Sequence, residues 1–419
     1  MKIESEKTFM SFILAAFCSV CVLIQPLFFS SMGIMGINYE GSESSGLYIY
    51  FTIFMAAAIF LIYIGASIVY GVGKRESIAL TSLLGIISLH FLWVILDGAD
   101  TELSTRFFEL FIVLGLPGFF AATIVLKCNI VIQTVKAFEL FVILIAIGVT
   151  FYSALPTLSG ELVKNIGGAS YQSLSYYSAF SFGMLLTYNN LLSNKGFRFR
   201  LLESKLFKII SIPLLVFTLF SCVLGGGRGA FLLLVMFLVF NIYASFKQQS
   251  SLENGGLSGT LVKVLFLCIV IVMFIVVFGD SNYINAGFER ATQFISPDGK
   301  IDLESGSSGR DTVYSLALQF IGDSPVLGYG PFGVRDKSLH AHNIFLEIWL
   351  QFGVVGLFLS IILFFYIVLR IIKNWCTPVV WASSILLYPL TLTLFSGSYM
   401  HMATFFFSGF LVYSLSKES

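Results

Sequence analysis

The stretch from Leu339 to Glu347 holds the residue types best suited to acid-base chemistry. It contains His340 and His342, two of the four histidines in a chain of 419 residues, and Asn343 stands four positions before Glu347, at helical spacing. A histidine at a water boundary titrates near neutral pH and accepts a proton from a hydroxyl group. Polar residues that cap a helix at a membrane interface would look the same. The stretch alone therefore leaves both interpretations open.

Arg228 lies among glycines, in the short connection between the apolar segments 207–224 and 229–246. Such a tight connection places the guanidinium group at the membrane surface. A permanent charge is costly there unless it meets an anion, and the forked donors of arginine suit phosphate oxygens. The alternative is an arginine whose long side chain simply reaches the interface.

Arg310 follows Ser308 and Gly309 and precedes apolar residues at helical spacing, which predict a short amphipathic helix that ends near residues 322–325. The backbone N–H groups at the start of that helix would add to the attraction for phosphate. Arg290 and Arg335 are further candidates for binding the same anion, although each is also what an ordinary solvated loop contains.

Residues 171–177 combine hydroxyl and aromatic groups, which can hydrogen-bond and stack on sugar rings. Tyr171 and Gln172 are the candidate sugar-binding residues of this stretch, and Asn343 and Glu347 are candidates for the same role. An aromatic belt at the membrane interface would have the same composition.

No metal or cofactor is expected. The acidic residues between 298 and 311 have no spacing typical of metal ligands, and the six cysteines lie in or near apolar segments. The chain contains no P-loop, G-x-G-x-x-G or H-E-x-x-H sequence.

The elements that must position these residues are membrane helices, because 57% of the chain is hydrophobic and only 11% is charged. We expect an all-α polytopic membrane protein that forms a single integral membrane domain over 1–419. A net charge of +1 without a basic cluster argues against nucleic-acid binding. Twelve apolar segments are predicted as transmembrane helices: 9–29, 47–70, 77–96, 107–126, 137–155, 173–192, 207–224, 229–246, 261–279, 353–372, 378–396 and 400–415.

The positive-inside rule predicts the orientation. With both termini cytoplasmic, sixteen of the 24 Lys and Arg residues fall on the cytoplasmic side. The long loop 280–341 is then periplasmic, and its short amphipathic helices would lie along the membrane surface.

The combination of motifs between residues 225 and 372 resembles the O-antigen ligase and O-antigen polymerase superfamily of bacterial envelope glycosyltransferases. The residues that carry the resemblance are Gly227-Arg228-Gly229-Ala230, Ser308-Gly309-Arg310, Ser324-Pro325-x-x-Gly328-x-Gly330, His340-Ala341-His342-Asn343-x-Phe345-Leu346-Glu347 and Gly353-x-x-Gly356-Leu357.

The resemblance implies a metal-independent, inverting glycosyl transfer at the periplasmic face of the bacterial inner membrane. The donor would be an undecaprenyl-pyrophosphate-linked oligosaccharide, and a chain-length-determining co-polymerase is an implied partner. Arg228 and Arg310 would then bind the pyrophosphate and His342 would deprotonate the acceptor hydroxyl, with His340 as the alternative base.

Several functions remain open from the sequence. A polymerase would join lipid-linked repeat units, whereas a ligase would move the finished glycan to the lipid A core; the forms of residues 171–173 and 225–228 favour the polymerase. A transporter of lipid-linked glycans would carry ionisable residues near the middle of the membrane, and a scaffold of envelope assembly would need no arginine in particular.

Overall fold

The computed structural model describes residues 2–37, 42–97, 101–158, 166–167, 169–192, 196–249, 310–332 and 341–416. Most of the predicted long loop lies outside these residues, together with Arg290, Arg335, His340 and the predicted segment 261–279. The other candidate site residues lie within them.

The described part of the chain is helical and contains no β-strand, although one isolated bridge joins Ile166 and Ala169. The all-α prediction is confirmed. In chain order the helical elements are α1 (Lys2–Val22), α2 (Ile24–Ile34), α3 (Ser42–Tyr70), α4 (Lys74–Asp97), α5 (Thr101–Leu110), η1 (Phe111–Gly115), α6 (Leu116–Lys127), α7 (Val131–Val149), η2 (Thr150–Ala154), α8 (Leu155–Leu158), α9 (Tyr171–Asn190), η3 (Arg200–Glu203), α10 (Lys205–Gly225), α11 (Arg228–Gln249), α15 (Arg310–Asp323), α16 (Ile344–Lys373), α17 (Thr377–Phe395), η5 (Tyr399–His401) and α18 (Ala403–Leu415).

Seven helices in the described residues are long and apolar enough to cross a membrane, or eight spans if the bent pair of α1 and α2 counts as one. The protein is therefore polytopic, as predicted. Eleven of the twelve predicted segments coincide with helices, and the remaining one, 261–279, lies outside the described residues. The helices α9, α10 and α18 are shorter or more polar than the eight spans, so the total of twelve stays a prediction.

The first predicted span, 9–29, is broken in the structure. Its two parts, α1 and α2, meet at an angle of 87°. Pro26 lies in the first turn of α2, where its missing N–H group costs no helical hydrogen bond. The chain therefore changes direction within the protein at Leu23, which is buried.

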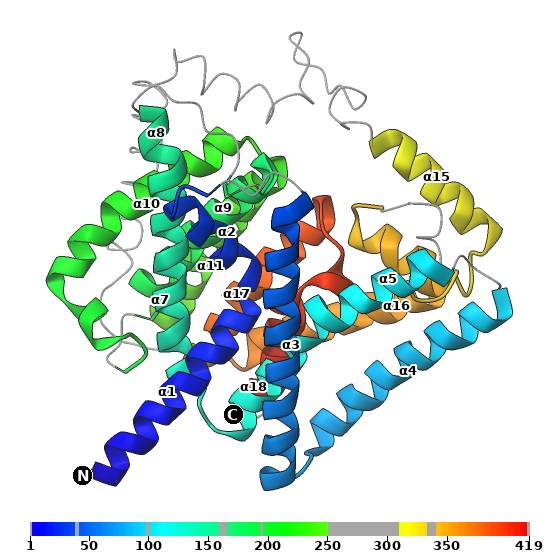
Figure 1. The fold of residues 1–419 in the computed structure, drawn as a ribbon, viewed down its shortest axis with the longest axis horizontal. Helices are drawn as coiled ribbons and strands as arrows, with labels where there is room; N and C mark the ends of the chain where they lie inside the picture. The colour runs from blue at the N-terminus through cyan, green and yellow to red at the C-terminus, as the bar shows by residue number, and fades with distance from the viewer. Residues whose placement is uncertain are drawn as a thin grey trace.

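Helix α9 lies at the centre of the bundle and packs against α7, α10, α11 and α17 (Figure 1). Every residue from Leu174 to Tyr188 is buried. Two of the hydroxyl groups along it are satisfied within the helix: Ser178 donates to the Leu174 carbonyl at 2.7 Å, and Ser181 donates to the Tyr177 carbonyl at 2.8 Å. Because protein surrounds α9 on all sides, it tolerates a polarity that lipid would not.

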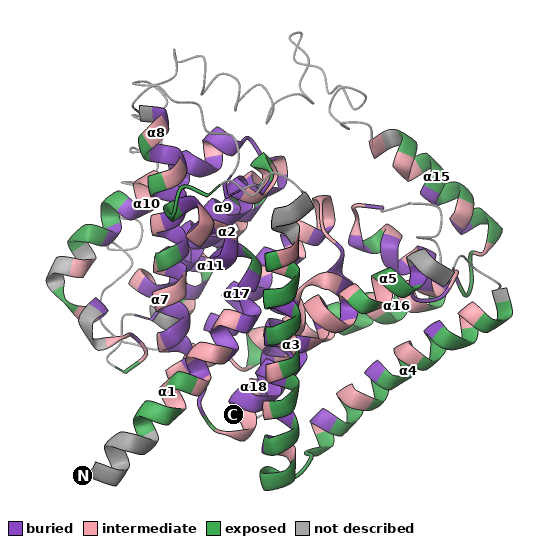
Figure 2. Cartoon of the chain, in the orientation of Figure 1, coloured by how far each residue is buried: buried purple, intermediate pink, exposed green. Residues whose placement is uncertain are grey.

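The helices at the periphery are exposed instead (Figure 2). Only 22% of the apolar window of α3, 11% of that of α4 and 6% of that of α16 is buried, against 67% for α17. These apolar, exposed faces are the ones that lipid would cover.

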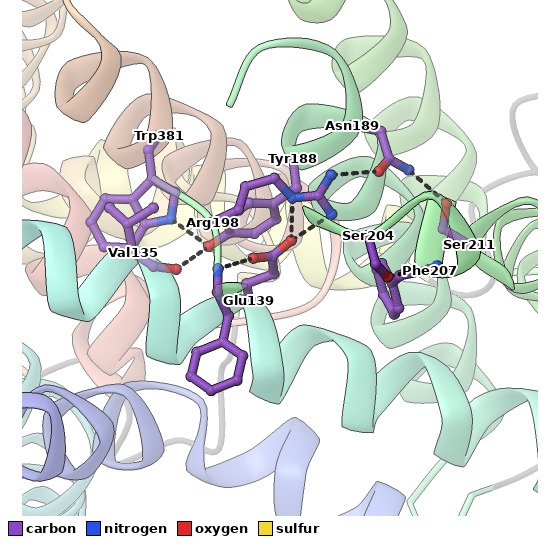
Figure 3. Close-up of polar contacts among 10 residues, drawn as sticks. Val135, Glu139, Tyr188, Asn189, Arg198, Ser204, Phe207, Ser211 and Trp381 are labelled. Carbon is purple, nitrogen blue, oxygen red and sulfur yellow. Dashed lines mark hydrogen bonds and ion pairs between the residues drawn. The ribbon is translucent and has the colours of Figure 1, made fainter. Parts of the chain in front are cut away.

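An ion pair is buried beside the C-terminal end of α9 (Figure 3). The Arg198 guanidinium lies 2.7 Å from the Glu139 carboxylate of α7, and the two side chains are 2% and 0% exposed. Arg198 also donates to the Asn189 side-chain oxygen at 3.2 Å, and the Phe199 N–H donates to Glu139 at 3.1 Å. We call this cluster the paired end of α9.

Candidate active site

The turn between α10 and α11 is held against the first turns of α9. Ser175 accepts a hydrogen bond from the Gly227 N–H at 3.0 Å and donates one to the Cys222 carbonyl at 3.2 Å. Gly226 has a φ of +64°, a left-handed conformation that glycine adopts without steric cost. One serine hydroxyl therefore ties the glycine turn to the centre of the bundle.

Gly229 brings the backbone of α11 close to the side chain of Tyr176. A Cβ atom at Gly229 would lie 1.8 Å from the Tyr176 hydroxyl oxygen. The absence of a side chain at Gly229 therefore allows the close approach of α11 to α9. This contact holds Arg228, the first residue of α11, beside the N-terminal end of α9. We call this end of α9 the site end.

Arg228 and Arg310 come together at the site end, although they are far apart in the sequence. Arg310 acts electrostatically on both Arg228 and Tyr176, and Arg228 in turn interacts with Tyr171. Like charges repel each other, so an anion bound near both would stabilise the arrangement. Each arginine is the first residue of its helix, where backbone N–H groups add to the attraction for an anion.

Helix α15 matches the loop helix predicted from the sequence, and it packs on the first turns of α16. Ala317 and Ile321 of α15 form a buried cluster with Ala341 and Leu350. This apolar contact orients the helix that carries Arg310.

The connection from α15 docks on a break in α16. The Pro325 carbonyl accepts a hydrogen bond from the Val354 N–H at 2.9 Å. Gly353 has a φ of +64°, and a Cβ atom there would lie 1.9 Å from the Val326 carbonyl oxygen. The Ser-Pro and Gly-x-x-Gly motifs therefore place α15 relative to α16, and the predicted span 353–372 is the part of α16 after this break.

His342 lies just before α16 and contacts the end of α17. Its Nδ1 atom is 3.2 Å from the Ser396 carbonyl oxygen, and the Ser396 hydroxyl donates to the Gln172 side-chain oxygen at 2.9 Å. A carbonyl oxygen only accepts, so in the neutral ring this contact puts the proton on Nδ1 and leaves Nε2 as the proton acceptor. His342 has a φ of +50°, a left-handed conformation that is uncommon outside glycine.

Asn343 is the N-cap of α16. Its side-chain oxygen accepts hydrogen bonds from the N–H groups of Phe345 at 3.0 Å and Leu346 at 3.3 Å. Of the two interpretations that the sequence left open, helix capping is thus the one that the structure shows for this residue.

Glu347 is buried and ties α16 to the segment between α17 and α18. Its carboxylate accepts a hydrogen bond from the Ser398 hydroxyl at 2.5 Å and one from the Gln351 amide at 3.4 Å. Tyr399 donates to the Gln351 side-chain oxygen at 2.7 Å. In the structure Glu347 therefore links α16 to the segment that follows α17. Its predicted role in sugar binding stays a prediction.

A cavity of about 300 Å³ lies beside this constellation. Gln172, Tyr176 and Ser396 are among its lining residues, so it reaches both the contact of His342 and the tyrosine that interacts with Arg310. Its other walls come from the break between α1 and α2 and from the start of α18. Among the described residues, the complete lining is Val22, Ile24, Gln25, Pro26, Tyr48, Leu114, Ser170, Gln172, Ser173, Tyr176, Tyr177, Tyr388, Leu392, Ser396, Gly397, Ser398, His401, Met402, Ala403 and Thr404.

Among these described lining residues, Gln172 is the one that was a candidate from the sequence, and the residues that the sequence missed include Tyr176, Ser396 and His401. Tyr176 belongs to the hydroxyl-rich stretch 171–177, which offered a signal. Ser396 and His401 come from the C-terminal helices, and no local pattern links them to residues 171–176.

An aromatic stack fixes the end of the loop beside the cavity. The Phe332 ring lies edge-on to His90 at 5.4 Å and parallel to His401 at 6.5 Å. His90 is buried, and its Nδ1 atom lies 3.1 Å from the Pro331 carbonyl oxygen. This stack joins α4, the loop and η5, which carries a wall of the cavity.

The structure thus brings together Arg228, Arg310, Tyr171, Gln172 and His342, all from the site end. No group of three or more His, Cys, Asp or Glu side chains that could hold a metal ion occurs within the described ranges. The remaining candidates, Arg290, Arg335 and His340, lie outside them.

Residues 213–361 match a protein-family model described as O-antigen ligase. This match confirms the resemblance to the O-antigen ligase and polymerase superfamily, and it covers most of the region 225–372 that carries the motifs. It supports a ligase-type or polymerase-type function and leaves the choice between the two to other observations. No curated protein sequence matches the chain.

Proposed function

From the O-antigen ligase match over residues 213–361, we propose that the protein is a membrane-embedded glycosyltransferase that polymerises lipid-linked oligosaccharide repeat units of the O-antigen or capsule type. The observation that carries the proposal is the approach of Arg228 to Arg310 at the end of the bundle where His342 also lies. The donor is an undecaprenyl-pyrophosphate-linked glycan, and the acceptor is a sugar hydroxyl of a second lipid-linked unit.

In this proposal Arg228 and Arg310 bind the pyrophosphate. Their forked donors pair with phosphate oxygens, and their charge stabilises the negative charge that develops when the bond between the sugar and the phosphate breaks. The positive charge is already in place before the reaction, so the step requires no metal ion or cofactor. Arg290 and Arg335 are further candidates for the same role.

His342 acts as the general base. Nε2 takes the proton from the acceptor hydroxyl while the hydroxyl oxygen attacks the anomeric carbon, and undecaprenyl pyrophosphate leaves from the opposite face with the bonding electrons. The configuration at the anomeric carbon is inverted. The Ser396 carbonyl supports this role because it holds the proton on Nδ1.

The ligase is the second candidate, because the matched family model carries that description. The polymerase is preferred because Gln172 lines the cavity and Tyr171 interacts with Arg228, so the stretch that favoured a polymerase lies at the proposed site. In both cases the active site faces the periplasm and both termini are cytoplasmic.

Deletion of the gene distinguishes the candidates. Loss of a polymerase leaves surface lipopolysaccharide with a single repeat, or a truncated capsule. Loss of a ligase removes O-antigen from the surface while lipid-linked polymer accumulates. If the deletion instead abolished translocation of the lipid-linked glycan and left joining in isolated membranes intact, the protein would be a transporter and the proposal would be wrong.

A further inference from the structure

Tyr176 is a buried polar group beside the proposed pyrophosphate site that the proposed reaction does not use. Its side chain is 3% exposed, and its hydroxyl finds no hydrogen-bond partner among the residues that the structure describes. Burial of a hydroxyl without a hydrogen bond costs free energy, so such a group in a native structure calls for a partner.

The position of this hydroxyl indicates where the partner would lie. Tyr176 lines the cavity of about 300 Å³, its hydroxyl touches the backbone of Gly229 next to Arg228, and it interacts electrostatically with Arg310. The hydroxyl therefore stands at the boundary between the cavity and the two arginines.

The lining of the cavity indicates the chemistry of the ligand. No Asp, Glu, Lys or Arg is among the described residues that line it, whereas hydroxyl and amide groups such as Ser173, Gln172 and Ser396 are. Tyr48, Tyr177 and Tyr388 add aromatic surface. A neutral lining rich in hydrogen-bonding groups and aromatic rings suits a sugar better than a phosphate group.

The size of the cavity limits the ligand further. Its volume is at the lower end of the range of roughly 300–1,000 Å³ for small-molecule sites. It has room for a single sugar ring, and the rest of a glycan would extend outside it.

We infer that this cavity is a carbohydrate subsite in which the Tyr176 hydroxyl hydrogen-bonds the sugar adjacent to the pyrophosphate. Arg228 and Arg310 hold the phosphates on one side of this hydroxyl, and the cavity receives the first sugar on the other. Tyr176 is therefore a positioning residue for the donor. The inference rests on the proposed function, because it takes the glycan of the lipid-linked donor as the ligand.

The test compares two lipids on the full-length protein in nanodiscs: the lipid-linked repeat unit extracted from the deletion strain, and undecaprenyl pyrophosphate without sugar. Tyr176→Phe removes only the hydroxyl. We expect it to weaken binding of the glycan-bearing lipid by about threefold to tenfold, the worth of one neutral hydrogen bond, and to leave binding of the bare lipid unchanged. Tyr243→Phe, on the exposed side of α11, is the matched control and should change neither.

Each other outcome is decisive. If Tyr176→Phe bound each lipid as tightly as the wild-type protein does, the subsite would be overturned and the proposed function would stand. An equal loss for both lipids would assign the hydroxyl to the phosphates and overturn the carbohydrate assignment. Failure of the wild-type protein to bind either lipid would overturn the proposed function itself. The unfolding temperature of Tyr176→Phe should not fall, because the hydroxyl has no partner to lose within the described structure.

Discussion

At the C-terminal end of α9, Arg198 lies 2.7 Å from Glu139 and both side chains are buried, whereas at the N-terminal end Arg228 and Arg310 approach each other beside tyrosines. The helix has 20 residues, so the two ends are about 30 Å apart, at 1.5 Å per residue. Arg198, beside one end of α9, is thus paired with a carboxylate, whereas Arg228 and Arg310 lie near the other end.

The two ends of α9 show what separates a structural arginine from a candidate functional one in an apolar bundle. A buried ion pair with its hydrogen bonds satisfied, such as Arg198 with Glu139, has no capacity left for a ligand. Two guanidinium groups that influence each other electrostatically attract a doubly charged anion such as pyrophosphate more strongly than one alone. The paired end should therefore control stability, and the site end should control activity.

The largest effect is expected for His342. His342→Ala should lower the rate of glycan joining by about 10²–10⁴-fold, the usual contribution of a general base, measured as repeat-unit ladders formed in membrane vesicles. Because His342 has a φ of +50°, His342→Asn is the control, since asparagine tolerates this conformation. If both variants kept near-wild-type rates, His342 would not be the general base of the proposed reaction.

At the paired end, Arg198→Ala should lower the free energy of unfolding by about 3–5 kcal/mol, because it leaves the Glu139 carboxylate buried without its partner. The rate per folded molecule should not change. Unfolding in detergent and activity per folded protein check the two parts separately. The double variant Arg198→Met with Glu139→Leu should recover much of the stability; a large loss of activity in this folded double variant would contradict the division of roles.

Arg228→Ala or Arg310→Ala should lower activity by about 10²–10³-fold, the typical cost of removing a donor that stabilises developing charge. The unfolding temperature of each variant is the control, and the loss of activity per folded molecule should exceed any loss of stability. Arg310→Lys keeps the charge but loses the forked donors, so it should retain an intermediate rate. Full activity of Arg310→Lys together with full activity of Arg310→Ala would favour a scaffold over an enzyme.

The smallest effect is expected at Asn343. Asn343→Ala should lower the free energy of unfolding by about 0.5–2 kcal/mol, because it removes the N-cap of α16. Thermal unfolding measures this change. Asn343→Asp retains a capping oxygen and should restore stability. If Asn343→Asp restored stability but not activity, the side chain would also bind the substrate.

The sequence predicted the local features well. Hydrophobic segments of span length gave the positions of eleven helices, and the spacing of apolar residues after Arg310 gave α15, which ends at Asp323 as the turn residues indicated. These predictions succeed because length and periodicity are local properties of the chain. The break between α1 and α2 was missed because apolar residues continue on both sides of Gln25 and Pro26, and a proline is tolerated inside many membrane helices.

The candidate site was predictable only in part. Arg228, Arg310 and His342 were identified because a charge or a histidine is conspicuous in an apolar chain. Ser396 and His401 were not, because serine and histidine near a helix end have many ordinary roles. The buried pair of Glu139 and Arg198 also gave no signal, since 59 residues separate the two partners.

Composition, length and residue type are local properties, and they were sufficient to give the class of protein, the approximate positions of the helices and the candidate residues for phosphate binding and proton transfer. The tertiary structure alone decided which of those residues meet. Contacts between α9, α11, α15 and α17 depend on close packing at Gly229 and Gly353. Such packing depends on how the surfaces of distant helices fit together, which no local sequence pattern shows. The same packing leaves the Tyr176 hydroxyl buried at the edge of a neutral cavity.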